Sequence, residues 1–510
     1  MKKLHILFAG LLCASALQAQ DLTDAIRYSE SEIQGTARFR ALSGAFGALG
    51  GDMSAVSINP ASSVIFSQSH AAFTLSNTDV KNKAFYFGNT NNEKESDFNI
   101  AQAGASLVFA SRSNSPWKKF SIGIAYDRTN SHDNFWRARG TNTNDDGNSS
   151  NSIAIYFYDH ANGKRLDEIS ALDGESITEA YSDIGRIYGF SHQQAFLGFE
   201  SYILEPDDIN DNANTTYSSN IAAGNFNHIY AYVGSGYNGK VSFNFAAQYE
   251  DKLSLGLNLN SHFIDYQKTT MLNETNNNTG SIVTDVYFEN TLATTGNGFS
   301  FQLGGILKLT PEFRVGLTYD SPTWYTIEEE TAQYIDTDEL ENQGFDPINP
   351  RTINIYPRYN LQTPGKFTGS LAYIFGNNGL ISFDYSRKDY SNIKFKPTYD
   401  YDDLNYDIDH TLTAASTYRV GGEYKIDRLS LRGGYRYEES PYKDGETVGD
   451  LNGYSLGLGY SFGNTKLDFT FDQWKRESIN NFYSLMSGGA PAASVNSKNS
   501  TFTLSLSFNI

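Results

Sequence analysis

Residues 241–260 read VSFNFAAQYEDKLSLGLNLN, which is two runs of alternating apolar and polar side chains around a polar turn. Phe243 and Phe245 share one face of the first run, and Leu255 and Leu257 share one face of the second. A period of two is the spacing of a β-strand, and about nine to eleven tilted residues can cross a bilayer. This stretch therefore predicts a β-hairpin that crosses a membrane with its apolar face toward lipid.

The same pattern recurs along the chain. Five further hairpins are predicted, with turns at Asn114 to Trp117, Thr310–Pro311, Asn377 to Gly379, Asp427 and Gly463–Asn464. Six hairpins give twelve strands, and single alternating runs around Phe73 and up to Ile510 add two more. The expected fold class is all-β, a transmembrane antiparallel β-barrel of about fourteen strands.

Long polar connections separate these hairpins on one side of the predicted barrel. They cover roughly 81–97, 130–238, 267–297, 322–365, 391–415, 439–452 and 475–499. The largest, about 130–238, is too long to be bare, and we expect a helix within 164–187. Short turns opposite long loops predict periplasmic turns, extracellular loops and, with an even strand number, both termini in the periplasm. A soluble β-sandwich also alternates but need not have such asymmetric loops.

The start of the chain predicts export to the outer membrane of a Gram-negative bacterium. Residues 1–19 combine Lys2 and Lys3 with a short apolar run and a small-residue end, which is typical of a secretory signal. Cys13, the one cysteine, lies in that run, so we expect a mature protein without thiols. Insertion into the membrane would involve outer-membrane lipid, lipopolysaccharide and the barrel assembly machinery.

Composition and motifs argue against several other functions. The net charge of −19 makes the chain a poor nucleic-acid binder. Residues 453–457, GYSLG, match a hydrolase nucleophile pattern but lie within an alternating strand with no helix after it. No catalytic set, no histidine pair at metal-ligand spacing and no cofactor motif can be assembled, so we expect neither an enzyme nor a metal or cofactor site.

Before the first strand stands GTARFRALSGAFGALGGDMSAVSINPASSVIFS, a Gly- and Ala-rich segment without alternation. It resembles the start of the FadL/OmpP1/TodX family of outer-membrane transporters of hydrophobic compounds, in a Bacteroidetes-type form. The residues that carry the resemblance include Gly35, Arg38, Gly44, Gly47, Gly51, Asp52, Asn59, Pro60 and Ala61.

The resemblance implies a domain organisation and a mechanism. Residues 20–67 would form a hatch that plugs a barrel made by residues 68–510. The protein would then take up small hydrophobic molecules passively, such as long-chain fatty acids or aromatic hydrocarbons, with a shift of the hatch. A kink in the third strand opens the wall sideways in that family. Gly123 is the candidate kink here, because a glycine inside a strand often marks a bend, although it could equally serve wall packing.

Charged residues on the predicted inner face have two readings. One arginine could hold the carboxylate of a fatty acid, since guanidinium groups pair bidentately with carboxylates. More often such residues form ion-pair ladders across a filled barrel. The candidates are Arg314, Arg419, Arg432 and Arg436.

A second function stays open at this stage. Barrels of the same superfamily serve as accessory or anchor components of type IX secretion, and the Ala-Gln ending of the signal suits such a role. A cavity beneath a hatch would favour the transporter, whereas loops that clasp another chain would favour the interaction protein.

Overall fold

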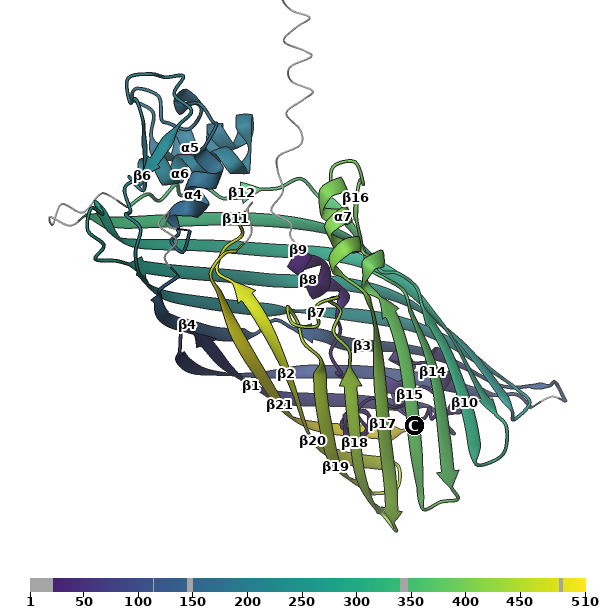
Figure 1. Cartoon of the computed structure of the whole chain (residues 1–510). Helices are drawn as coiled ribbons and strands as arrows, with labels where there is room; N and C mark the ends of the chain where they lie inside the picture. Colours follow the sequence, from purple (N-terminus) through teal and green to yellow (C-terminus); the bar gives the residue numbers. More distant parts are fainter. Residues whose placement is uncertain (1–21, 113, 145–149, 340–346, 486–488) are drawn as a thin grey trace, which may run out of the picture.

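The computed structural model describes residues 22–112, 114–144, 150–339, 347–485 and 489–510, so the predicted signal segment lies outside the described residues. Fourteen antiparallel strands form a closed barrel (Figure 1), in which the first strand pairs with the last. The wall strands are β1 (His70–Tyr86), β2 (Asn89–Ala110), β3 (Trp117–Ser131), β7 (Phe226–Tyr249), β8 (Leu253–Thr275), β9 (Val283–Lys308), β10 (Phe313–Asp320), β14 (Lys366–Phe375), β15 (Gly379–Asp389), β17 (Ala414–Ile426), β18 (Leu429–Glu438), β19 (Leu451–Ser461), β20 (Thr465–Asn481) and β21 (Ala492–Asn509). The fold class predicted from the sequence is confirmed.

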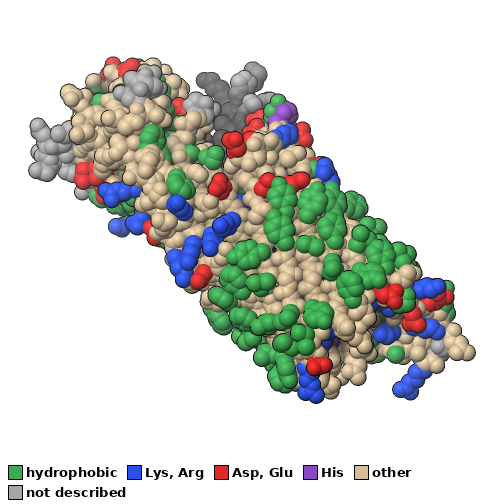
Figure 2. Space-filling view, turned by 60° about the horizontal axis from the view of Figure 1, so that its bottom comes forward, with side chains coloured by type: hydrophobic (Ala, Val, Ile, Leu, Met, Phe, Trp, Pro, Cys, Tyr) green, Lys and Arg blue, Asp and Glu red, His purple; other side chains and the backbone are tan. Residues whose placement is uncertain are grey.

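The alternation of side chains divides the wall into an outer and an inner face as predicted. Phe243 and Leu303 are 48% and 49% exposed on the outside, whereas Asn244 and Asn258 on the same strands are buried inside. Figure 2 shows the outward apolar side chains gathered as a broad zone, which we call the apolar belt. The belt is where the wall meets hydrocarbon, since only a closed sheet with an apolar exterior satisfies its backbone in lipid.

The turns at one end of the barrel lie where the sequence predicts them. Residues 250–252, 309–312, 376–378, 427–428 and 462–464 each join two neighbouring strands, and Ile510 lies at the same end. We call this end the short-turn side and the other the loop side. No helix among the described residues is long and apolar enough to span a membrane.

Several predicted loops are largely strand, which is a correction. β1 and β2 are joined by Phe87 and Gly88 alone, and β8 and β9 by residues 276–282. The region 322–365 contains further strands, and β20 extends to Asn481. These extensions lie on the loop side of the belt, where neither face contacts lipid, so their residues carry no apolar alternation for sequence reading to detect. The additional strands are β4 (Asn134–Asn142), β11 (Trp324–Glu339), β12 (Asn354–Ile355), β13 (Tyr359–Gln362) and β16 (Lys394–Lys396).

The long connection after β4 folds into a helical cap on the loop side (Figure 1). It comprises α4 (Ala154–Ala161), η3 (Leu166–Glu168), α5 (Ile177–Tyr188), α6 (Phe190–Glu200) and the hairpin of β5 (Leu204–Pro206) and β6 (Tyr217–Ser219). A helix was predicted within 164–187, and α5 begins there at Ile177. The buried carboxylate of Glu274 ties the cap to the wall, because it accepts hydrogen bonds from Ser152 and from the backbone N–H of Ile153. Shorter loop-side elements are η4 (Tyr390–Asn392) and α7 (Asp402–Thr411).

The segment before β1 lies inside the barrel (Figure 1). It contains α2 (Leu22–Ser29), α3 (Ala37–Ala41), η1 (Ser54–Ser57) and η2 (Pro60–Ile65). Ile26 and Tyr28 of α2 pack with Tyr325 of β11 and Ile408 of α7, on the loop side of the lumen. The described chain therefore begins on the loop side and runs through the lumen toward the short-turn side, where β1 starts. The expectation that the segment stays at the periplasmic end fails for α2.

Candidate functional site: the hatch and the cavity above it

Residues 36–66, which we call the hatch, fold through local side-chain caps and glycines. The Thr36 hydroxyl caps α3 by accepting the N–H of Phe39 at 3.2 Å, and it donates to Asp52 at 2.7 Å. Asn59 caps η2 by accepting the N–H of Ala61 at 3.1 Å, and Pro60 begins that helix. Asn59 has φ −141° and ψ 110°, as predicted for a residue before proline.

Asn59 also joins the hatch to itself and to the wall. Its fully buried amide donates to the carbonyl oxygens of Gly47 at 2.8 Å and of Gly305 in β9 at 3.1 Å. The loop at Gly47 is held from the opposite side, because Asp384 of β15 accepts the N–H groups of Phe46 and Gly47, both at 3.0 Å. Strands on different sides of the lumen therefore grip the same short segment.

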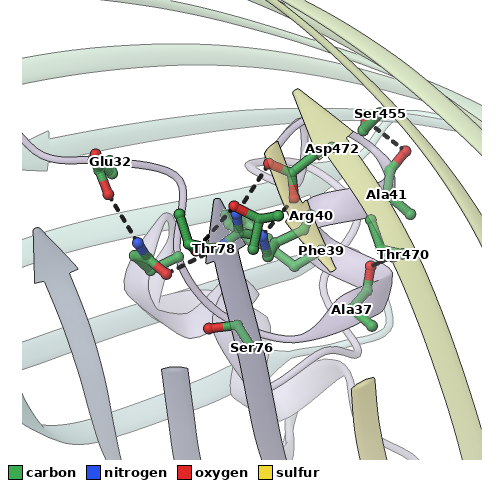
Figure 3. Close-up of polar contacts among 12 residues, drawn as sticks. Glu32, Ala37, Phe39, Arg40, Ala41, Ser76, Thr78, Ser455, Thr470 and Asp472 are labelled. Carbon is green, nitrogen blue, oxygen red and sulfur yellow. Dashed lines mark hydrogen bonds and ion pairs between the residues drawn. The ribbon is translucent and has the colours of Figure 1, made fainter. Parts of the chain in front are cut away.

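Two arginines of α3 form ion pairs with the wall. Arg38 donates to both carboxylate oxygens of Glu423 in β17, at 2.9 and 3.3 Å, and Arg432 of β18 donates to the same group at 2.6 Å. Arg40 donates to both oxygens of Asp472 in β20, at 2.7 and 2.9 Å. Figure 3 shows Arg40 between Asp472 and a chain of polar contacts that leads to Glu32.

Small polar side chains complete the closure. Ser455 donates to the carbonyl of Ala41 at 2.9 Å, and Thr470 donates to that of Ala37 (Figure 3). On the other side of the lumen, Asn258 of β8 donates to the carbonyl of Val56 at 2.8 Å. Hydrogen bonds to backbone carbonyls fix the position of the hatch without any matching side chain on it, which is why its sequence shows no sign of these contacts.

Glycines of the wall allow the hatch backbone to approach closely, a feature that the sequence reading did not single out. A Cβ added at Gly256 would lie 2.3 Å from the backbone of Pro60, and one at Gly316 would lie 2.3 Å from the carbonyl oxygen of Gly47. A Cβ at Gly434 would lie 2.6 Å from Leu42. The wall is thus shaped to the hatch, because any larger inward side chain at these positions would displace it.

The four candidate lumen arginines have different surroundings. Arg314 donates to the carbonyl of Leu49 at 2.8 Å and so holds the hatch. Arg432 bridges Glu423 and Asp468, and Arg436 pairs with Glu438 at 3.3 Å. Arg419 forms no ion pair with the described residues, and its buried Nε has no hydrogen-bond partner among them.

Arg419 faces a cavity of about 110 Å³ inside the barrel, which we call the central cavity. Glu30, Ser31 and Glu32, between α2 and the hatch, line it together with side chains from six wall strands. Lys388 also lines it and donates to the carbonyl of Ser29 but forms no ion pair with the described residues. The remaining charged residues of its lining are Lys366, Arg436, Glu438, Glu439 and Arg476.

Gly123 lies in a regular part of β3. It pairs with Ser106 of β2 and Asn244 of β7, and the register shifts of β3 fall elsewhere, between Trp117 and Lys119 and between Arg128 and Asn130. The structure therefore shows no bend in strand pairing at Gly123, and its role in a gate stays a prediction.

A closed membrane barrel whose lumen is filled by its own N-terminal segment defines a class of gated outer-membrane channel. The chain belongs to the family described as outer membrane protein transport protein (OMPP1/FadL/TodX), whose model matches residues 208–510. The family is thus one of transport proteins, not of enzymes, and it places the chain in the outer membrane. No curated protein matches the chain.

Solved structures with the same fold cover almost the whole chain. A FadL homologue of Pseudomonas aeruginosa is 12% identical with a TM-score of 0.54, over 94% of this chain and 99% of that one. The toluene transporter TbuX of Ralstonia pickettii is 14% identical with a TM-score of 0.47, over 93% of this chain and 99% of that one. A structure of the toluene transporter TodX of P. putida is 12% identical with a TM-score of 0.49, over 94% and 99%.

Proposed function

We propose that the protein takes up amphiphiles with an apolar tail and an anionic head, such as long-chain fatty acids, by passive passage through the hatch-gated barrel. The observation that carries this proposal is the central cavity, where Arg419 and Lys388 have no anionic partner among the described residues. A guanidinium group binds carboxylate through two parallel hydrogen bonds. Removing a carboxylate from water is costly unless such a partner compensates it.

The cavity makes a neutral aromatic hydrocarbon the weaker candidate. Charged side chains dominate its lining, and toluene would displace their water without replacing the hydrogen bonds. At about 110 Å³ the cavity holds a head group but not a long tail, so the tail must lie along another path. A head-group site therefore suits an amphiphile better than a small hydrocarbon.

The hatch would be the barrier between this cavity and the short-turn side, which we assign to the periplasm. Its ion pairs through Arg38 and Arg40 and its contacts with wall glycines close the lumen at one level. Because Glu30 to Glu32 connect α2 directly to the hatch and line the cavity, a ligand there would contact the element that must move. Release of the ligand would then be coupled to displacement of the hatch.

Uptake of tritiated oleate and of labelled toluene by a Gram-negative host that lacks its own transporters tests the proposal. We expect Arg419→Gln to lower oleate uptake by roughly tenfold, the cost of a lost charged hydrogen bond, and to leave toluene uptake unchanged. Lys475→Gln is the matched control, because Lys475 is exposed on β20 and does not line the cavity. Equal loss for both substrates, or oleate uptake at the unsubstituted level, would exclude the anionic-head site.

A further inference from the structure

Two neighbouring wall strands are interrupted at the same height. β10 ends at Asp320 and β11 begins at Trp324, while β13 ends at Gln362 and β14 begins at Lys366. Asp320 pairs with Lys366 and Trp324 pairs with Gln362, so the two gaps face each other. We call the two facing segments, 321–323 and 363–365, the double break.

Each gap shifts the alternation of its strand by one residue. On the short-turn side of the double break, even-numbered residues such as Thr318 and Thr368 are buried. On the loop side the buried positions are odd-numbered, such as Tyr325 and Leu361. The neighbouring strand β9 keeps one phase throughout. Both gaps therefore act as β-bulges, which bend strands and concentrate next to functional sites.

The double break has few backbone hydrogen bonds. Pro322 and Pro364 have no N–H to donate. Among the described residues one backbone bond joins the two segments, from the N–H of Thr363 to the carbonyl of Thr323 at 3.0 Å. A second bond runs from the N–H of Thr323 to the hydroxyl of Thr363, also at 3.0 Å. A side-chain bond of this kind can be broken by a rotamer change without disturbing a strand ladder.

The central cavity adjoins the double break on the inside. Lys366, directly after Gly365, lines the cavity and pairs with Asp320 at 3.1 Å. Lys388, the next strand's contribution to the cavity, lies opposite Lys366 in the pairing of β14 with β15. The wall between the cavity and the outside is therefore interrupted at this point.

Lipid-facing aromatic residues flank the double break on the outside. Trp324 is 42% exposed and pairs with Phe299, and the rings of Tyr319 and Phe367 lie 4.8 Å apart below it. Farther toward the loop side, the outward residues are polar or charged, as with Glu328. The double break therefore lies at the loop-side border of the apolar belt, where aromatic residues mark the boundary between lipid head groups and hydrocarbon.

We propose that the barrel wall opens sideways at the double break and lets the apolar tail of an amphiphile pass into the membrane while its anionic head occupies the central cavity. This inference rests on the proposed function and adds the place of exit. It puts the opening between β10–β11 and β13–β14, in the middle of the chain, and not at Gly123 of β3. The position suits an amphiphile, because the cavity and the hydrocarbon meet at the border where head and tail separate.

A cross-link across the double break tests the proposal. Thr323→Cys with Thr363→Cys places two thiols at a hydrogen-bonded contact, in a chain whose one native cysteine is Cys13. Thr269→Cys with Thr291→Cys is the matched control, because these threonines face each other at 3.2 Å on the uninterrupted strands β8 and β9. A short bifunctional thiosulfonate reagent joins either pair without demanding ideal disulfide geometry, and electrophoresis gives the cross-linked fraction.

We expect the cross-linked Thr323/Thr363 variant to take up tritiated oleate roughly tenfold more slowly, with full recovery on reduction, because a covalent bond prevents separation of the strands. The control pair should transport at the unsubstituted rate in both states. Unchanged uptake by the cross-linked variant would overturn the exit site. Failure of the proposed function looks different, since the unsubstituted protein would then show no oleate uptake at all.

Discussion

Arg38 of the hatch and Glu423 of β17 form an ion pair, with Nε 2.9 Å from the carboxylate, and Arg432 of β18 binds the same carboxylate at 2.6 Å. The plug and the wall therefore share one buried anion. Because the wall supplies its own arginine, Glu423 stays paired when the hatch leaves. The barrel can thus keep its structure while the plug moves.

Arg38→Gln should loosen the hatch without unfolding the barrel. Losing one buried partner costs up to about 3 to 5 kcal/mol, but Arg432 still neutralises Glu423, so the loss falls on the hatch contact. We expect more frequent ion-conducting openings in planar lipid bilayers. Arg137→Gln, which removes an ion pair with Glu93 at the exposed surface, should leave the current unchanged. A silent Arg38→Gln channel would show that this ion pair does not hold the plug.

Gly256→Val should displace the hatch by steric pressure. A Cβ at Gly256 would lie 2.3 Å from the backbone of Pro60, whereas one at Gly369 would meet nothing within 4 Å. We therefore expect Gly256→Val, and not the matched Gly369→Val, to expose residues 36–66 to protease in detergent while both variants keep the barrel's heat-resistant mobility on gels. Equal protection of the two hatches would refute the close contact.

Lysine substitutions along β9 should locate the border of the apolar belt. Leu303 and Thr295 both point outward, but only Leu303 lies within the belt. Leu303→Lys should cost about 2 to 4 kcal/mol in urea unfolding from lipid vesicles, and Thr295→Lys should cost close to nothing. Similar costs at both positions would place Thr295 in the membrane. Asn258 is no mild control, because its buried amide bonds the hatch and Gln302.

The helical cap should lose stability as the pH falls from about 6.5 toward 4. Burial lowers the pKa of His160 in α4 to about 4, so the folded cap keeps the ring neutral while the unfolded chain binds a proton in this range. Hydrogen exchange of α4 and α6 amides should accelerate over that interval. His160→Gln should flatten the response, and an undiminished pH dependence in that variant would assign it to other groups.

The sequence by itself determined the elements that meet lipid. Strands such as 241–249 and 253–259 must alternate because one face contacts hydrocarbon and the other does not, and this requirement is written into the order of residues. The same reasoning located the short turns, such as the one at Asp427, and the number of strands. The Gly-rich segment with Asn59 and Pro60 was recognisable from composition and from its resemblance to a family.

Only the tertiary structure decided what fills the barrel. Above the belt both faces of β7 to β9 meet polar surroundings, so no periodicity revealed how far these strands extend. The partners of Arg38 and Arg40 lie hundreds of residues away, at Glu423 and Asp472, and local sequence cannot specify such contacts. The free charge of Arg419 and the facing gaps at Pro322 and Pro364 likewise arise from strand register, because register alone determines which side chains and which breaks become neighbours.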